Sequence, residues 1–138
     1  MFVLDCSVAI SWCIQDEHNI YADAVFTLLS GGNQAIIPGI WWLEIINVLL
    51  VAERRQRSTW VQTTEALTIL RSLPIAIDDA PFSHTIDSVI NLGREHNIAA
   101  YDAAYLELAL RQELLLATID HRLAKVAQNL GCLLEDPR

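Results

Sequence analysis

Short apolar runs that alternate with segments of helical periodicity constrain this chain more than any other feature. The runs do not alternate with polar residues, which is typical of strands that are covered on both faces. The segments between them repeat apolar residues three and four positions apart, as amphipathic helices do. This alternation predicts an α/β fold in which one parallel sheet lies between two helical layers. The five predicted strands are residues 2–4, 35–37, 75–77, 114–118 and 132–134.

Several helix ends can be predicted from capping signals. Thr59 and Gln62 have the spacing of a capping box, in which two side chains satisfy free backbone groups at a helix start. Gly31 and Gly131 follow apolar stripes and are expected to end their helices. A chain of 138 residues has the length of one domain, so we expect a single domain over residues 1–138.

The composition excludes several classes of protein. Hydrophobic residues make up 53% of the chain, which excludes a disordered protein. The 17 acidic and 9 basic residues give a formal charge of −8, which excludes a broad basic face for nucleic acid. The most apolar stretch, 38–52, is too short to cross a bilayer, and Asp5 interrupts any N-terminal signal. We therefore expect a cytoplasmic protein without membrane contact. We also expect buried, reduced cysteines, because three cysteines cannot all pair and no two have metal-finger spacing.

Two aspartates are predicted to lie at the carboxyl ends of strands. Asp5 directly follows the first apolar run, and Asp120 follows the run at 114–118. Both side chains would then point toward the edge of the sheet where ligands bind in open parallel sheets. A simpler interpretation is that each aspartate caps the helix after it. Capping and catalysis are compatible, so both interpretations stay open.

Two further acidic residues lie on predicted helices in apolar surroundings. Glu44 and Asn47 are the only polar residues in the stretch 38–52, and they share one helix face. Asp102 begins a predicted helix, 102–112, at the end of its inward-facing stripe. An ionised carboxylate in such surroundings must be protonated or find a cation. The alternatives are that Glu44 faces solvent and that Asp102 only interacts with the helix dipole.

Together, the four carboxylates would concentrate negative charge in one small site. Repulsion between carboxylates a few ångströms apart costs several kcal/mol, so such a site must take up protons or bind cations. Oxygen ligands without histidine or cysteine suit Mg²⁺ or Mn²⁺. These ions bind phosphate oxygens and turn water into a nucleophile. The acidic residues therefore indicate metal-dependent chemistry on a phosphate ester.

Four short motifs surround the acidic residues. In chain order they are Asp5-Cys6-Ser7, Glu44-Ile45-Ile46-Asn47-Val48-Leu49, Tyr101-Asp102-Ala103-Ala104-Tyr105 and Ala117-Thr118-Ile119-Asp120. In this order and at these spacings, the chain resembles the PIN-domain ribonucleases, and specifically the VapC-type toxins of prokaryotic toxin–antitoxin pairs. The resemblance covers nearly the whole length.

The resemblance implies a three-layer α/β/α fold with five parallel strands in the order 3-2-1-4-5. It also implies Mg²⁺- or Mn²⁺-dependent endonucleolytic cleavage of RNA, and an antitoxin that occupies the groove. The catalytic and metal-binding residues would be Asp5, Glu44, Asp102 and Asp120. The residues that support them by hydrogen bonds would be Ser7, Asn47 and Thr118. Some relatives carry another acidic residue after the fourth position, where this chain has His121-Arg122, so Arg122 is a candidate phosphate contact.

A basic cluster and the high hydropathy point to partners. Arg54, Arg55 and Arg57 are expected at the end of the Glu44 helix and are candidates for RNA or antitoxin contact, with Trp60 available to stack on a base. The alternative is that these cations only stabilise the helix C-terminus. The mean hydropathy of +0.31 is high for a small domain, so we expect surplus apolar surface to be buried in a homodimer.

Three functions stay open at this point. The first is a metal-dependent endoribonuclease that leaves 5′-phosphate and 3′-hydroxyl ends. The second is a phosphatase or phosphotransferase with Asp5 as nucleophile, as in haloacid-dehalogenase-like enzymes. Those enzymes carry a second aspartate where this chain has Ser7. The third is a non-catalytic PIN-fold module that binds RNA or protein. The complete acidic set favours the first.

Overall fold

Four short parallel strands form one sheet in the order β3-β2-β1-β4. The computed structural model describes Met1–Arg138. The strands are β1 (Phe2–Leu4), β2 (Ala35–Ile37), β3 (Ile75–Ile77) and β4 (Leu116–Ala117). Their order confirms the predicted arrangement of the first four strands. The predicted strand at 114–118 is shorter than expected, because only its two central residues pair with β1.

The predicted fifth strand is not formed. Residues 132–134 lie beside β4, but they make a single parallel bridge between Leu116 and Leu133. Two backbone hydrogen bonds flank this bridge: the Leu116 N–H donates to the Cys132 carbonyl at 2.6 Å, and the Leu134 N–H donates to the Leu116 carbonyl at 2.8 Å. The physical reason is that β4 has only two residues, so a neighbouring segment finds too few backbone groups on β4 to pair with as a strand. The prediction of five strands was therefore wrong, although the segment does lie at the expected edge.

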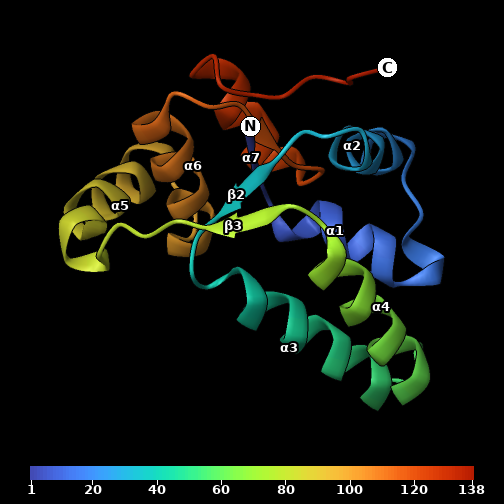
Figure 1. Cartoon of the computed structure of the whole chain (residues 1–138). Helices are drawn as coiled ribbons and strands as arrows, with labels where there is room; N and C mark the ends of the chain where they lie inside the picture. The colour runs from blue at the N-terminus through green and yellow to red at the C-terminus, as the bar shows by residue number, and fades with distance from the viewer.

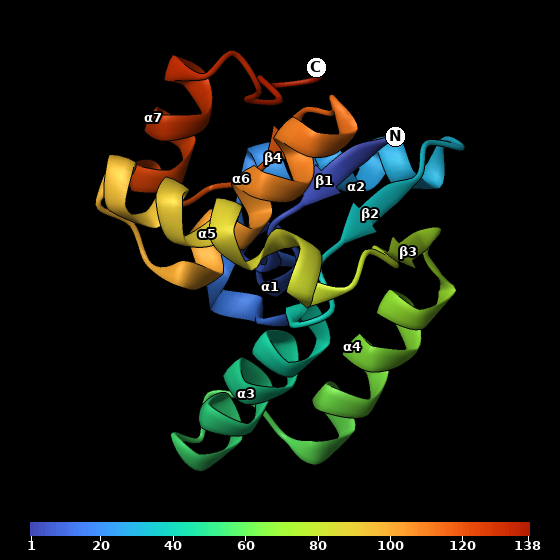
Figure 2. The same cartoon turned by 90° about the vertical axis from the view of Figure 1, so that its left-hand side faces the viewer.

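Helices cover both sides of the sheet, which confirms the α/β prediction. Figure 1 shows α5 and α6 on one side of the strands and α1 to α4 on the other. After a turn of 90°, α3 and α4 extend away from the sheet as a pair (Figure 2). The helices are α1 (Cys6–Cys13), α2 (Ile20–Ser30), α3 (Trp41–Arg54), α4 (Trp60–Ser72), α5 (Phe82–His96), α6 (Ala100–Gln112) and α7 (His121–Asn129), with a 3-10 turn, η1, at Gln15–Glu17.

The predicted helix ends agree with the structure. Thr59 and Gln62 form the complete capping box at the start of α4. Gly31 is the C-cap of α2, and Gly131 has a φ of 74°, a left-handed conformation that favours glycine. No helix is both long and apolar enough to span a bilayer.

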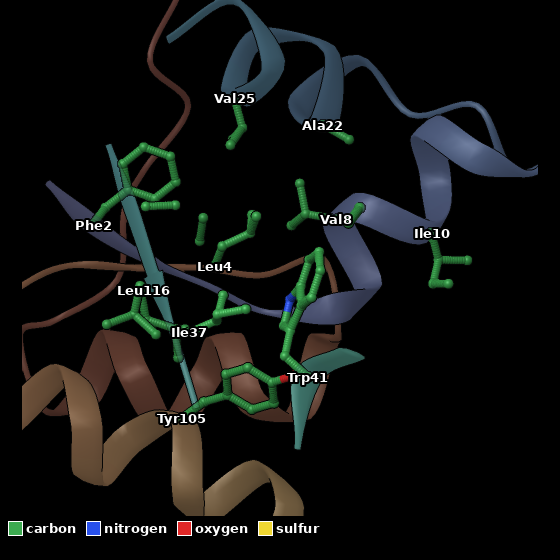
Figure 3. Close-up of a cluster of buried hydrophobic side chains, with 14 of the residues drawn as sticks. Phe2, Leu4, Val8, Ile10, Ala22, Val25, Ile37, Trp41, Tyr105 and Leu116 are labelled. Carbon is green, nitrogen blue, oxygen red and sulfur yellow. The ribbon is translucent and has the colours of Figure 1, made fainter. Parts of the chain in front are cut away.

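One hydrophobic core joins the sheet to both helical layers. Leu4 and Ile37 contribute from the strands, Val8 from α1, and Trp41 from the start of α3, and all four are completely buried. Figure 3 shows these side chains together with Tyr105, whose ring enters the cluster from α6. The core therefore fixes the starts of α1 and α3, and the middle of α6, relative to the carboxyl ends of the strands.

The register of the neighbouring strands β1 and β4 determines what lies at their carboxyl ends. Leu4 pairs with Ala117, so the residues that follow them, Asp5 and Thr118, emerge next to each other. The Asp5 N–H donates to the Ala117 carbonyl at 2.9 Å, which continues the ladder by one hydrogen bond. The structure thus brings an aspartate and a threonine together that are 113 residues apart in sequence.

Candidate functional site

Asp5 is a buried carboxylate held by two hydroxyl groups. Its side chain is 4% exposed, and its Oδ2 accepts hydrogen bonds from Ser7 Oγ at 2.6 Å and from Thr118 Oγ1 at 2.7 Å. Burial is the main cause that raises its pKa, with a smaller contribution from the charge of Asp120, and the two hydroxyl bonds act against this rise. Asp5 occupies the N-cap position of α1, but its side chain makes no capping hydrogen bond. The simple capping interpretation therefore fails for Asp5.

Asp120 lies beside Asp5 through a shared set of hydroxyl contacts. The Asp120 N–H donates to Thr118 Oγ1 at 3.1 Å, so one threonine hydroxyl contacts both aspartates. Similarly, the Ile119 N–H donates to Ser7 Oγ at 3.2 Å. Asp120 also caps α7, because its Oδ1 accepts from the Leu123 N–H at 2.8 Å. The capping interpretation holds for Asp120, whose side chain is exposed at the edge of the sheet.

Glu44 is held from both sides on the first turn of α3. The Tyr105 hydroxyl donates to its Oε1 at 2.7 Å, and the Cys6 thiol lies 3.6 Å from its Oε2 as a weak donor. Burial is the first cause that raises the pKa of Glu44, and the charge of Asp5 adds to it. The side chain is half-buried, so the alternative of a glutamate that simply faces solvent is not what the structure contains.

Asp102 lies in the first turn of α6, among the other three carboxylates. The helix begins at Ala100, two residues earlier than predicted. The pKa of Asp102 is raised to about 6, first by burial and then by the charges of Asp5, Asp120 and Glu44, while the charge of Arg122 acts in the opposite direction. A helix dipole alone would lower this pKa. The four predicted acidic residues are therefore near enough to repel one another.

The oxygen donors of this cluster fit a hard divalent cation that keeps part of its water shell. No three histidine, cysteine, aspartate or glutamate side chains are close enough to enclose a metal ion between them. This excludes a fully formed cage of the kind that structural zinc uses. Mg²⁺ by contrast binds through one or two carboxylates and retains several waters. The repulsion at Asp102 is a further reason why a cation would be favoured here.

A groove of about 380 Å³ lies next to Glu44. It is lined by Ile40, Leu43, Glu44, Asn47 and Tyr101. Asn47 is exposed there, one turn after Glu44, and it forms no hydrogen bond with any acidic residue. The expectation that Asn47 supports the carboxylates by hydrogen bonding is therefore not met, and its amide is free to contact a ligand in the groove.

The predicted basic residues divide into two groups. Arg57 is engaged within the protein, because its guanidinium pairs with Asp16 and with Glu17, both at 2.9 Å. Arg54 and Arg55 are exposed at the C-terminal end of α3 and form no ion pair. Ten residues of helix separate Arg54 from Glu44, which corresponds to about 15 Å.

Arg122 is the one predicted basic residue near the acidic cluster. It is exposed in the first turn of α7, and its charge lowers the pKa of Asp102. It therefore provides a positive charge at the rim of an otherwise negative site.

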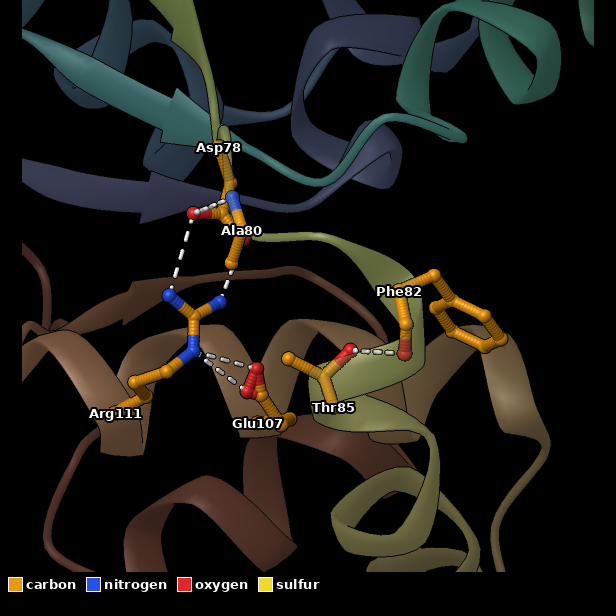
Figure 4. A network of polar contacts seen from close by, with 6 residues as sticks. All are labelled: Asp78, Ala80, Phe82, Thr85, Glu107 and Arg111. Atoms are coloured by element: carbon orange, nitrogen blue, oxygen red, sulfur yellow. Dashed lines mark hydrogen bonds and ion pairs between the residues drawn. The ribbon is translucent and has the colours of Figure 1, made fainter.

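A second, larger pocket of about 450 Å³ lies between α5, α6 and the loop after β3. Figure 4 shows that Arg111 connects the elements around it. Its Nε donates to Glu107 at 2.9 Å and its terminal nitrogens donate to Asp78, the shorter contact being 2.5 Å. Each of the three guanidinium nitrogens thus donates to a carboxylate of the protein, so this network holds the loop after β3 against α6.

Fold and site together define a class of protein: an α/β protein with a parallel sheet and a carboxylate cluster at the carboxyl ends of β1 and β4. The chain belongs to the PIN domain family, whose model matches residues 2–129. Members of this family are generally nucleases, typically with divalent metals.

Two solved structures share the fold at low sequence identity. PAE2754 from Pyrobaculum aerophilum is 19% identical, with a TM-score of 0.68 over 94% of each chain. A toxin–antitoxin complex from Klebsiella pneumoniae contains a chain that is 20% identical, with a TM-score of 0.55 over 86% of this chain and 85% of that one. A comparison with curated protein sequences gives no significant match.

Sequence reasoning missed two residues at the site, Tyr105 and Cys6. Tyr105 was named in the motif Tyr101-Asp102-Ala103-Ala104-Tyr105 and falls on the inward-facing stripe of its helix, but it was given no role at the site, yet its hydroxyl is the principal donor to Glu44. A signal was present, because a tyrosine on a buried stripe needs a hydrogen-bond partner, and no partner was assigned. Cys6 gave no such signal, because a half-buried cysteine usually behaves as a small apolar residue.

Proposed function

We propose that this protein is a Mg²⁺- or Mn²⁺-dependent endoribonuclease. The observation that carries the proposal is a set of hydrogen bonds among the segments of the four carboxylates: Thr118 Oγ1 contacts Asp5 and the backbone of Asp120, and the Tyr105 hydroxyl, on the helix of Asp102, donates to Glu44. The raised pKa of Asp102, to which the other three charges contribute, agrees with this arrangement. Membership of the PIN domain family, residues 2–129, supports a nuclease function. A cation is needed to bring an RNA phosphate to such a site, because the protein and the substrate are both negatively charged.

The four carboxylates have different roles in this proposal. Asp5, Asp102 and Asp120 would hold the cation, directly or through water, and Glu44 would bind it or orient a water molecule. A bound divalent ion polarises the phosphate and lowers the pKa of water. Ser7 and Thr118 keep Asp5 in one orientation through their bonds to Oδ2, so that Oδ1 stays free of these two hydroxyls. Arg122 and Asn47 are candidates for contacts with the RNA.

We further propose that the protein is the VapC-type toxin of a type II toxin–antitoxin pair in the cytoplasm. Support comes from the sequence motifs and from the similarity to a chain in the toxin–antitoxin complex from Klebsiella pneumoniae. A cognate antitoxin would occupy the groove beside Glu44. The unpaired Arg54 and Arg55 are candidates for contact with the antitoxin or with RNA.

A homodimer is part of the same proposal. Leu43, Ile46 and Leu50 form an exposed apolar stripe on α3, and Leu43 is 68% exposed. Such a stripe at the surface of a small domain is typical of an interface. Sedimentation or light scattering of the purified protein would measure the oligomeric state, and a monomer at micromolar concentration would contradict the dimer.

The experiment that tests the activity is cleavage of total RNA by the purified protein, with Mn²⁺ and with EDTA. We expect cleavage only with the metal, and products with 5′-phosphate and 3′-hydroxyl ends. Asp5→Asn and Asp102→Asn should abolish cleavage while circular dichroism shows an intact fold. Cleavage by either variant at the parent rate would contradict the assigned site.

A second candidate function is a non-catalytic PIN-fold module that binds RNA or protein. The observation that favours it is that no three acidic side chains are arranged to enclose a metal ion. Titration with Mn²⁺ separates the two candidates. An ion that binds only the folded state raises the melting temperature, so no shift at millimolar Mn²⁺, together with intact RNA, would favour the binding module.

A further inference from the structure

We propose that Tyr105 is a positioning residue, whose hydroxyl fixes the Glu44 carboxylate and links three of the segments that carry acidic residues. This inference rests on the proposed metal-dependent function. It assigns a role to a residue that lies on α6, three residues after Asp102, and outside the set of four carboxylates.

The Tyr105 side chain has no freedom to choose another partner. The residue is completely buried, and its ring packs in the core among residues that include Leu4 and Trp41 (Figure 3). A buried phenol must donate its proton, because an unpaired polar group in the interior is costly. Its one acceptor is Glu44 Oε1, at 2.7 Å. The position of the carboxylate oxygen is therefore set by a ring that the core holds in place.

The same hydroxyl also accepts a bond from the start of α1. The Cys6 N–H points at the Tyr105 oxygen at a distance of 3.4 Å, and Cys6 directly follows Asp5. Tyr105 thus connects the segment of Asp5, the helix of Asp102 and the helix of Glu44. If the hydroxyl is removed, these segments lose the only side-chain hydrogen bonds that join α6 to α1 and to α3.

The Cys6 thiol completes the contact with Glu44 from the other side. It lies 3.6 Å from Oε2, whereas Tyr105 bonds to Oε1, so each carboxylate oxygen has one donor. The remaining lone pairs are available at the groove that Glu44 lines. Loss of the stronger donor would let the half-buried side chain rotate within that groove. Residues that orient metal ligands typically contribute about 10- to 100-fold to metal affinity or activity.

The test is Tyr105→Phe, which removes the hydroxyl and keeps the ring. We expect the Mn²⁺ concentration for half-maximal binding, measured by calorimetry at 10 °C, to rise about tenfold or more. The half-saturating Mn²⁺ concentration for RNA cleavage should rise in parallel, while the half-saturating RNA concentration stays unchanged. Circular dichroism at the same temperature establishes that the variant is folded.

Thr63→Val is the matched control. Thr63 Oγ1 donates to Glu53 Oε1 at 3.1 Å, so this variant also removes a hydroxyl bond to a glutamate of α3, but at the other end of the helix. It should bind Mn²⁺ as the parent does. If the half-saturating Mn²⁺ concentration rose as much in Thr63→Val as in Tyr105→Phe, any lost hydroxyl bond to α3 would weaken metal binding. That result would overturn a specific role for Tyr105.

A double-mutant cycle with Glu44→Ala, which removes the acceptor of the Tyr105 hydroxyl, tests whether Tyr105 acts through Glu44. In the Glu44→Ala background, Tyr105→Phe should change Mn²⁺ binding by less than about twofold, because residues that act through one contact are not additive. The inference is overturned if Tyr105→Phe weakens Mn²⁺ binding as much in that background as in the parent, or if Tyr105→Phe alone leaves Mn²⁺ binding unchanged. Either result leaves the proposed function intact. A parent protein that neither binds Mn²⁺ nor cleaves RNA overturns both.

Discussion

Replacement of Asp102 by asparagine should make the metal-free protein more stable at neutral pH, while it abolishes activity. The reason is that burial and the charges of Asp5, Asp120 and Glu44 disfavour the ionised form of Asp102 in the folded state. Asparagine has nearly the same shape and no charge. The attraction of Arg122 acts against the repulsion and does not cancel it, since the pKa of Asp102 is still raised to about 6.

The size of the effect follows from the difference between the two pKa values. A rise from the ordinary value of 3.8 to about 6 corresponds to at most about 3 kcal/mol. Because the Asp102 side chain is partly exposed, solvent screening reduces this to about 1 kcal/mol. For a domain of this length, 1 kcal/mol shifts the melting temperature by about 3–5 °C.

The pH dependence of this gain has a definite sign. Asp102 holds its proton more tightly in the folded state than in the unfolded state. As the pH rises, the unfolded state therefore ionises first, and the parent loses stability between about pH 4 and pH 6. The advantage of Asp102→Asn should therefore be complete above pH 7 and absent below about pH 4.

Differential scanning calorimetry in EDTA measures the melting temperatures of the parent and of Asp102→Asn at pH 7.5, where the gain is expected, and at pH 4, where it is not. Asp87→Asn is the matched control, because Asp87 is exposed on α5 and has no hydrogen-bond partner, and it should leave the melting temperature unchanged. A metal-free Asp102→Asn protein that melts below the parent at pH 7.5 would refute the reasoning. It would mean that the carboxylate is held by favourable contacts.

Three other outcomes are expected. Thr118→Val should lower the free energy of unfolding by about 1.5–3 kcal/mol in urea denaturation, because the buried carboxylate of Asp5 loses one of its two hydroxyl donors; an unchanged midpoint would contradict this. Arg111→Met should cost about 1–3 kcal/mol by the same method, since it leaves the largely buried Glu107 and Asp78 without their cation; an equally stable variant would show that this network does not stabilise the fold. Mg²⁺ or Mn²⁺ at about 100 times its dissociation constant should stabilise the parent by about 2.7 kcal/mol, reversed by EDTA.

The arrangement of the acidic residues could be predicted because strand order and position in the chain determine it. Asp5 and Asp120 follow β1 and β4, which are neighbours in the sheet, and the carboxyl ends of neighbouring parallel strands meet at one edge. Glu44 could be recognised because a carboxylate in an apolar stretch needs a special environment. Asp102 was predicted to begin its helix, and the start two residues earlier changes nothing in its position near the other carboxylates.

The remaining features depend on contacts that no local pattern encodes. The apolar segment 132–134 was expected to be a strand, but strand formation needs a neighbouring edge of sufficient length, and β4 has two residues. The partner of the Tyr105 hydroxyl lies 61 residues away on α3, so only the packing of both helices brings the two together. The pairing of Arg57 with Asp16 and Glu17, instead of an external partner, depends on the position of the 3-10 turn.

Asp120 caps α7 in addition to its proposed role at the metal site, and this affects how variants at this position would behave in cells. Its Oδ1 accepts from the Leu123 N–H and begins α7, so alanine at this position removes a helix cap as well as a charge, at a cost of about 0.5–2 kcal/mol. Asparagine keeps the capping oxygen. Because a small loss of stability lowers cellular abundance, Asp120→Ala should accumulate to a lower level than Asp120→Asn. Under the proposed toxin function, a selection for inactive variants would therefore recover two kinds of change at this codon: Asp120→Asn, which removes only the charge, and Asp120→Ala, which also lowers abundance.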